Sequence, residues 1–101
     1  MKTTAKQRAK LRSLSNRLET ILQTGKNGLS DPFIKTVDDA LEARELIKIK
    51  VLENCPQLPR EMAYILAEKV GAEVVSTVGS RFVLFRQARD PKKRKISLEL
   101  D

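Results

Sequence analysis

The residues best placed to do chemistry in this sequence are Gly25-Lys26-Asn27-Gly28, a GxxG motif between a predicted strand and a predicted helix. Two glycines allow a backbone to approach a phosphate closely, and the free N–H groups and dipole of a helix start favour an anion. Lys26 adds positive charge at the tip, and loops of this form clamp the sugar-phosphate backbone in one class of RNA binders. The motif also occurs as an ordinary tight turn, and without other support we favour the turn over a phosphate-binding loop. Asp31, in the first helical turn, would also compete with a phosphate.

Further basic side chains could contact phosphates from other parts of the chain. Lys48 and Lys50 lie on one face of a predicted strand, and Arg81 and Arg86 flank the last strand. Each pair also has a structural interpretation, as a solvated strand face or as residues that close the ends of a strand. With the glycine loop, the candidate phosphate-contacting residues are Lys6, Lys10, Arg17, Gly25, Lys26, Asn27, Gly28, Lys48, Lys50, Arg81, Arg86, Lys93 and Arg94.

Composition excludes most hydrolase chemistry, because the sequence has no His. Without His, neither a Ser/His/Asp nor a Cys/His nucleophile can be assembled as usually built. Cys55 is the single cysteine, which excludes a CxxC pair and an internal disulfide and fits a reducing compartment. The sequence has no GxGxxG or Walker A loop, and its acids resemble ordinary helix-surface residues. We therefore expect no enzymatic activity, no cofactor and no metal site.

Positive charge is concentrated at the two ends of the chain. The 101 residues include 20 Lys plus Arg and 13 Asp plus Glu, a net charge of +7. Residues 1–28 carry seven basic groups against one acid, residues 29–80 six against nine, and residues 81–101 seven against three. If both ends meet beside the glycine loop, they form one basic cradle for a polyanion, with an acidic back that includes Asp38, Asp39, Glu42 and Glu45. A solubilising surface without a partner is the alternative.

Local signals predict three helices. Thr4 and Gln7 have the spacing of a capping box that opens a helix over residues 4–16. Ser30 is a good N-cap for a second helix. Pro59 suits the first turn of a third helix, and Gly71 suits its C-terminal end.

Four β-rich segments are predicted strands, at residues 20–24, 46–52, 73–78 and 81–86, and Gly79-Ser80 predicts a two-residue hairpin with glycine first. The last strand is apolar on both faces, so we expect the second and third helices to cover one face of the sheet and the first helix to cover part of the other. The order αβαβαββ predicts an α/β fold of the α+β two-layer type. Residues 87–101 form a basic tail that can dock or stay mobile.

Six segments, in this order and at this spacing, carry a family resemblance. They are Gly25-Lys26-Asn27-Gly28-Leu29, Asp39-Ala40-Leu41, Glu45-Leu46-Ile47-Lys48-Ile49-Lys50-Val51, Val78-Gly79, Val83-Leu84-Phe85-Arg86 and Arg94-Lys95-Ile96-Ser97-Leu98. Together they resemble the bacterial YhbY family of stand-alone CRM domains, named for chloroplast RNA splicing and ribosome maturation. The resemblance covers nearly the whole chain, and it is far more specific than the glycine loop alone.

The resemblance implies a four-stranded mixed sheet with three helices, similar to the C-terminal domain of translation initiation factor three, with residues 1–86 as a single CRM domain. It implies RNA binding without catalysis and association with precursors of the large ribosomal subunit, while plant relatives use the domain in group II intron splicing. The family's basic surface falls on the first helix, the loop at residues 25–28 and the neighbouring strand ends. Phe85 stands where a Tyr is common, and Ser80-Arg81 follows Gly79 where a Lys or Arg usually comes at once.

We therefore expect a cytoplasmic, monomeric RNA-binding protein with no membrane segment, which associates with rRNA in precursors of the large ribosomal subunit. It would hold structured RNA mainly through phosphates, with slight sequence specificity. The alternative is a basic adaptor that binds an acidic protein partner, with RNA contact incidental.

Overall fold

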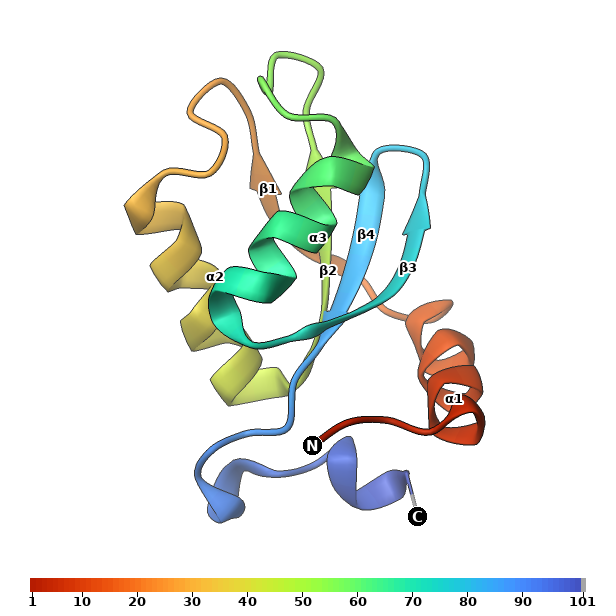
Figure 1. Ribbon diagram of the computed structural model, residues 1–101. Coiled ribbons are helices and arrows are strands. Elements are labelled where there is room, and N and C mark those ends of the chain that lie inside the picture. The colour runs from red at the N-terminus through yellow and green to blue at the C-terminus, as the bar shows by residue number, and fades with distance from the viewer. Residues whose placement is uncertain (101) are drawn as a thin grey trace.

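The structure, a computed structural model, describes residues 1–100, in which three helices and a four-stranded sheet are followed by two short 3-10 turns (Figure 1). In chain order the elements are α1 Ala5–Ser15, β1 Thr20–Thr24, α2 Asp31–Arg44, β2 Leu46–Val51, α3 Pro59–Val70, β3 Glu73–Val78, β4 Arg81–Phe85, η1 Pro91–Lys93 and η2 Ser97–Glu99. The strand order is β1-β2-β4-β3, with β1 parallel to β2 and the other neighbours antiparallel. The predicted αβαβαββ order and mixed four-stranded sheet are confirmed.

The helices begin and end at the residues that local signals indicate. The Thr4 hydroxyl accepts the Gln7 N–H at 3.2 Å, and the Gln7 side chain accepts the Thr4 N–H at 2.9 Å, which completes the capping box of α1. Ser30 caps α2 by accepting the Phe33 N–H at 3.3 Å, and α3 ends at Gly71 with a φ of 69°. Among residues 1–100, no helix has both the length and the apolar character that a membrane span requires.

The β3–β4 hairpin has the predicted two-residue turn. Val78 pairs with Arg81, and of the two residues between them only Gly79 has a positive φ, at 58°. A turn with glycine in the first central position matches the twist of the flanking strands. The prediction of a glycine-first hairpin is therefore confirmed.

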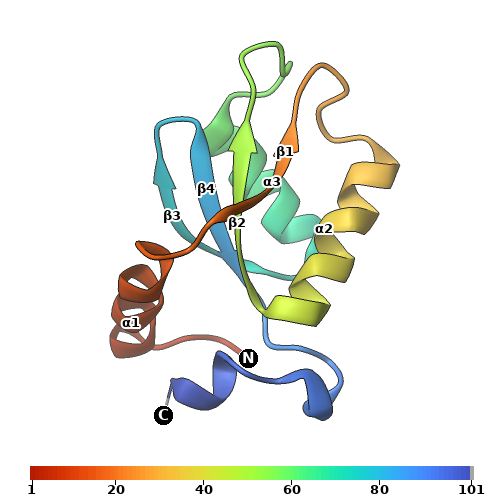
Figure 2. The same cartoon turned by 180° about the vertical axis from the view of Figure 1, so that it is seen from behind.

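The two faces of the sheet are covered unequally. Helices α2 and α3 cover the front face, where the strands contribute Ile47, Ile49, Phe82 and Leu84 to the main core (Figure 1). The opposite face, called the rear face below, carries α1 (Figure 2). Its smaller core comprises Leu11, Leu46, Val83, Phe85 and Leu100. Because this core lies at the start of β2 and the end of β4, no helix formed by residues 1–100 covers the part of the rear face nearer the β3–β4 turn. The expected cover of both faces is confirmed.

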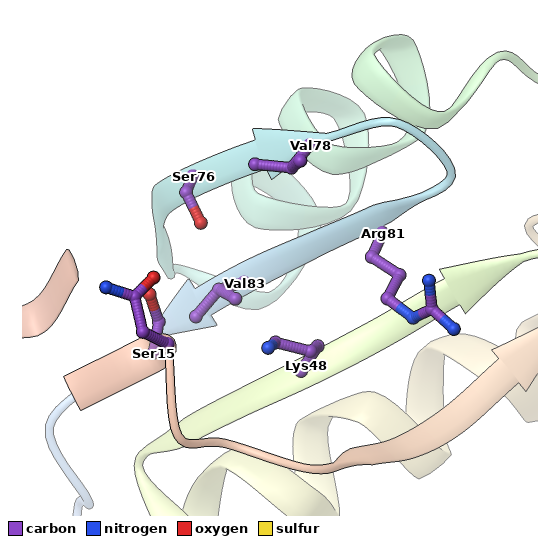
Figure 3. A pocket seen from close by; sticks show the side chains of 7 residues that line it. Ser15, Lys48, Ser76, Val78, Arg81 and Val83 are labelled. Carbon is purple, nitrogen blue, oxygen red and sulfur yellow. The ribbon is translucent and has the colours of Figure 1, made fainter. Parts of the chain in front are cut away.

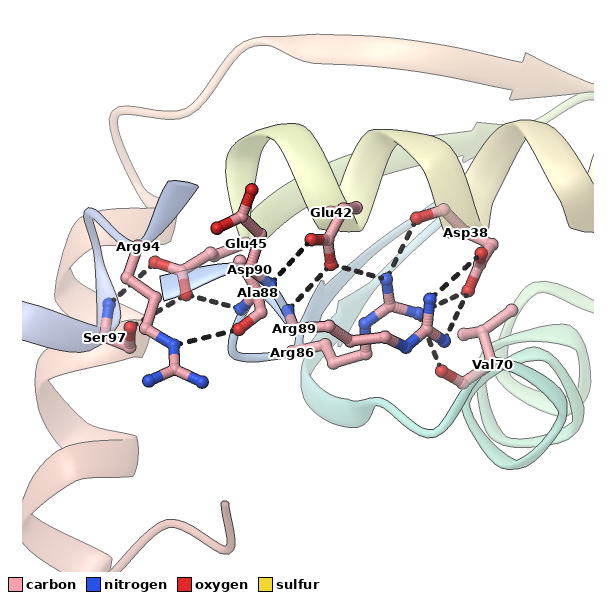
Figure 4. A network of polar contacts seen from close by, with 10 residues as sticks. All are labelled: Asp38, Glu42, Glu45, Val70, Arg86, Ala88, Arg89, Asp90, Arg94 and Ser97. Atoms are coloured by element: carbon pink, nitrogen blue, oxygen red, sulfur yellow. Dashed lines mark hydrogen bonds and ion pairs between the residues drawn. The ribbon is translucent and has the colours of Figure 1, made fainter. Parts of the chain in front are cut away.

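The C-terminal tail docks against the end of α2. Glu45, the residue after α2, is fully buried, and its carboxylate accepts the backbone N–H groups of Ala88 at 2.7 Å, Lys95 at 2.7 Å and Ser97 at 3.0 Å. The Ser97 hydroxyl donates a fourth hydrogen bond at 2.8 Å (Figure 4). Burial alone would raise the pKa of Glu45, but these donors outweigh it and lower the pKa below its usual 4.5. One carboxylate therefore holds three separate points of the tail.

Candidate nucleic-acid interface

The glycine loop forms a tight turn that presents Lys26 and Asn27 to solvent. The Gly28 N–H donates to the Gly25 carbonyl at 2.9 Å, and the Thr24 hydroxyl donates to the Gly28 carbonyl at 3.0 Å. Lys26 and Asn27 lie at the exposed corner, whereas Gly28 is buried. The loop is thus both an ordinary turn and an exposed, positively charged tip.

Both glycines of the loop lie close to side chains of the segment after β2. A Cβ at Gly25 would lie 2.8 Å from the Asn54 side-chain oxygen, and one at Gly28 would contact the Gln57 side-chain oxygen and lie 3.0 Å from Pro56. Gly28 also has a φ of 54°, which favours glycine. The segment after β2 therefore makes the close approach that the motif predicts, and the positive φ of Gly28 explains this glycine without a phosphate.

The start of α2 offers an anion less than an uncapped helix would. Ser30 already accepts one of the first N–H groups, that of Phe33, and Asp31 places a negative charge in the first turn. Both features reduce the positive potential that a helix start presents. The positive charge of this loop therefore rests on Lys26.

The rear face brings together three of the predicted cations. Alternation along β2 turns Lys48 and Lys50 to this face, about 7 Å apart for two residues of a strand. Arg81 is the register partner of Lys50 on β4, and its guanidinium donates to the Thr20 hydroxyl at 3.2 Å. Within residues 1–100, Lys48 and Lys50 form no ion pair or hydrogen bond with a side chain. This face can therefore offer its cations to phosphates directly.

A cavity of about 230 Å³ opens beside these cations (Figure 3). It is lined by Ser15, Asn16, Lys48, Ser76, Val78, Arg81 and Val83. None of these seven residues is acidic. The cavity lies where the end of α1 meets the uncovered part of the sheet.

The expected convergence of both chain ends beside the glycine loop is wrong. The ends do meet, since Lys10 donates to the Glu99 carbonyl, but they meet at the end of the sheet where β2 begins (Figures 1 and 2). Strand β1 starts on that side and runs away from it, so the loop after Thr24 emerges at the opposite end. The positive charge is therefore arranged along the molecule and does not form a single cradle.

The remaining predicted cations lie toward the chain ends. Lys6 on α1 and Lys93 in η1 are exposed, and Arg17 is exposed after α1. Arg17 lines a second cavity, of about 220 Å³, together with Arg44. Arg94 is half-buried, and its side chain donates to the Ala88 carbonyl at 2.9 Å. None of these four predicted cations lines the cavity beside Lys48.

Arg86 does not belong with the exposed cations. It is 8% exposed, and its guanidinium donates to the carboxylate and the carbonyl of Asp38 and to the Val70 carbonyl, and lies 3.6 Å from Glu42 (Figure 4). Hydrogen bonds from Arg89 and from Arg86 lower the pKa of Asp38. The expectation that Arg86 extends a surface patch is wrong, because these partners hold it inside the protein.

The expected acidic back is also wrong in most of its members. Asp38 and Glu42 bind Arg86, and Glu45 is buried against the tail. Asp39 alone of the four stays exposed, in an ion pair with Lys35 at 3.3 Å. These acids serve the fold, and they do not present a separate acidic surface.

Sequence reasoning missed Ser76 and Val78 because of an irregularity in β3. The register shifts between Val74 and Ser76, so that Ser76 lies opposite Val83 and Val78 opposite Arg81. An extra residue in a strand reverses the alternation of the side chains beyond it. Without the pairing register, nothing in this segment predicts that both residues face the rear.

Comparison with known proteins finds the same domain along almost the whole chain. The CRS1 / YhbY (CRM) domain model matches residues 4–86. The chain is 40% identical over 90 residues to Probable RNA-binding protein YqeI of Bacillus subtilis (strain 168), covering 89% of this chain and 94% of that protein. It is 29% identical over 87 residues to an RNA-binding protein of Haemophilus influenzae, covering 86% and 88% of the two chains. The solution structure of the hypothetical protein SAV1595 from Staphylococcus aureus matches with a TM-score of 0.74 and 39% identity, over 93% of this chain and 98% of that one.

Proposed function

Because this chain belongs to the CRS1/YhbY (CRM) domain family, a non-catalytic family of RNA-binding domains, we propose that it binds rRNA and assists assembly of the large ribosomal subunit. The names of the Bacillus subtilis and Haemophilus influenzae relatives support RNA as the ligand. The RNA backbone is held by the exposed glycine-loop tip and by the cations of the rear face. Binding is therefore dominated by phosphate contacts and depends steeply on salt.

The observation that carries this proposal is the set of cations without internal partners. Lys48 and Lys50 form no ion pair within the described residues, and Lys26 lies at an exposed corner. A phosphate can therefore approach these ammonium groups without breaking an internal bond. Such contacts position RNA without reading its bases, so sequence specificity is slight.

Salt dependence of binding to an rRNA fragment tests the proposal. Fluorescence anisotropy from about 50 to 200 mM salt gives the slope of log K against log salt, and removing one phosphate-binding cation makes that slope shallower by about 0.7–0.9. We expect this change for Lys26→Ala and for Lys48→Ala. Lys35→Ala is the matched control, because it removes the same charge from an exposed ion pair on α2. If all three variants have the wild-type slope, or the same shallower slope, the proposed surface is wrong.

The ribosomal role needs a separate measurement. The protein should sediment with precursors of the large subunit from cell extracts, and nuclease treatment should release it. A complex that survives nuclease would instead favour the adaptor, which binds an acidic protein partner.

A further inference from the structure

The cavity beside Lys48 has the size of a site for one small chemical group. Its volume of about 230 Å³ is below the roughly 300–1,000 Å³ of pockets that enclose drug-sized ligands. Three strands form its floor, since Lys48 comes from β2, Arg81 and Val83 from β4, and Ser76 from β3 (Figure 3). Ser15 and Asn16, at the end of α1, close one side.

The lining combines three kinds of surface that one nucleotide also combines. Val78 supplies an apolar side chain that is 75% exposed, whereas Val83 lies beneath it and is 2% exposed. Ser76, Ser15 and Asn16 supply short polar groups. Lys48 and Arg81 supply positive charge without an acid in the lining. A lone phosphate would use the charge but leave Val78 uncovered, whereas a nucleotide has an apolar base face, polar edges and a phosphate.

We propose that this cavity receives the base of one unstacked nucleotide of the bound RNA, with the base against Val78 beside the Arg81 guanidinium and the adjoining phosphate at Lys48. The proposal rests on the RNA binding proposed above. Unpaired bases in RNA stack on aromatic rings or on Arg guanidinium planes. Phe82 and Phe85 are each 1% exposed, so these aromatic rings are closed to a base, and Arg81 is the planar group that the cavity offers.

This site would make the protein prefer RNA with an unpaired nucleotide. Two RNA hairpins test this, identical except that one carries a single bulged 2-aminopurine in its stem. Wild-type protein should bind the bulged hairpin at least about fivefold more tightly, the lower end of what one stacked base contributes. The 2-aminopurine fluorescence should change on binding, because its base moves into the cavity.

Ser76 is half-buried in the lining, so the larger side chain of Ser76→Leu should fill the cavity. This variant should bind the two hairpins equally and should leave the 2-aminopurine signal at its value in free RNA. Ser13→Leu is the matched control, because Ser13 is exposed on α1 and does not line the cavity. It should keep the wild-type preference. Circular dichroism confirms that both variants fold.

The loop variant separates this proposal from the proposed function. Lys26→Ala should weaken binding of both hairpins by the same factor and keep the ratio between them. Equal binding of the two hairpins by wild-type protein, or an unchanged preference in a folded Ser76→Leu, would overturn the nucleotide site and leave RNA binding intact. Failure of wild-type protein to bind either hairpin or rRNA would overturn the proposed function itself.

Discussion

Replacement of Glu45 tests whether one buried carboxylate holds the C-terminal tail on the fold. The carboxylate accepts four hydrogen bonds, from the N–H groups of Ala88, Lys95 and Ser97 and from the Ser97 hydroxyl. Glu45→Ala removes the acceptor of all four at once. The donors are then left in a space from which water is excluded, unless the tail leaves it.

The expected loss in free energy of unfolding is about 3–5 kcal/mol, because a buried donor left without its acceptor costs roughly 1–3 kcal/mol and several of the four donors are affected. Single hydrogen bonds to a charged group contribute roughly 1.5–3 kcal/mol each, so a simple sum would be larger. The tail limits the loss, because Ala88 and Ser97 can undock and regain hydrogen bonds to water. The loss therefore cannot exceed the free energy of docking the tail.

Glu45→Gly is the matched variant, because it changes the backbone strain without restoring the carboxylate. Glu45 has a φ of 66° and a ψ of −36°, a conformation that costs a residue with a Cβ about 1–3 kcal/mol. Glycine adopts this conformation readily. We therefore expect Glu45→Gly to be more stable than Glu45→Ala by about 1 kcal/mol or more, although both lack the side chain that binds the tail.

Urea unfolding at pH 7, followed by circular dichroism, measures these differences. Amide hydrogen exchange locates them, and we expect faster exchange at Ala88 and Ser97 with the strands still protected. If Glu45→Ala is as stable as wild type, the carboxylate does not hold the tail. If the Ala and Gly variants are equally stable, the strain at this position is absent.

Three further predictions concern stability. The pKa values of Asp38 and Glu45 are lowered from their usual 3.8 and 4.5, so both carboxylates stabilise the folded state at a pH above these usual values. The free energy of unfolding should therefore be constant near neutral pH and should fall as the pH drops below them. Urea unfolding across pH should show a flatter decline for Glu45→Gln than for wild type. Gly79→Ala should lower the free energy of unfolding by about 1–2 kcal/mol, because Gly79 has a positive φ. Gly28→Ala should lower it further in the same assay, because a Cβ at Gly28 would also meet Gln57 and Pro56. Equal losses for the two variants would contradict this. Thr4→Ala should lower the free energy of unfolding by about 1 kcal/mol, because it removes the N-cap of α1. A thermal midpoint equal to that of wild type would show that the capping box does not stabilise α1.

The elements were predictable because their signals are local. The capping box at Thr4, the cap at Ser30 and the glycine of the β3–β4 turn each act within four residues of the chain. Alternation in β4 also predicted a strand that is apolar on both faces and needs cover on both, because strand side chains have a period of two. These signals were sufficient for the fold class and for the order of the elements.

The arrangement of the candidate site could not be predicted in the same way, because it depends on contacts between distant segments. Arg86 follows a strand and carries a charge, as an exposed residue would, and only its approach to Asp38, 48 residues away, buries it. Glu45 did offer a local signal. An acid at the C-terminal end of a helix opposes the helix dipole, which indicates that the side chain has a partner elsewhere.

The distribution of acids explains how a chain with 13 carboxylates leaves the rear face basic. Several acids of the central segment bind groups within the protein. Glu45 binds the tail, Glu73 accepts the Thr3 N–H and hydroxyl, and Asp38 binds Arg86. Folding thereby engages these acids in internal bonds, while Lys48, Lys50 and Arg81 lie together on the rear face.

Internal bonds also rank the candidate cations by what RNA must displace. A phosphate that reaches Lys48 or Lys50 replaces only water, because neither ammonium group has a partner within residues 1–100. A phosphate that reaches Lys10 must first replace the Glu99 carbonyl, and Arg86 would have to leave an ion pair with Asp38. At Lys10 and Arg86, the free-energy cost of breaking this internal bond offsets part of the new interaction with RNA. The rear face should therefore contribute more to RNA affinity than an equal number of cations at the chain ends.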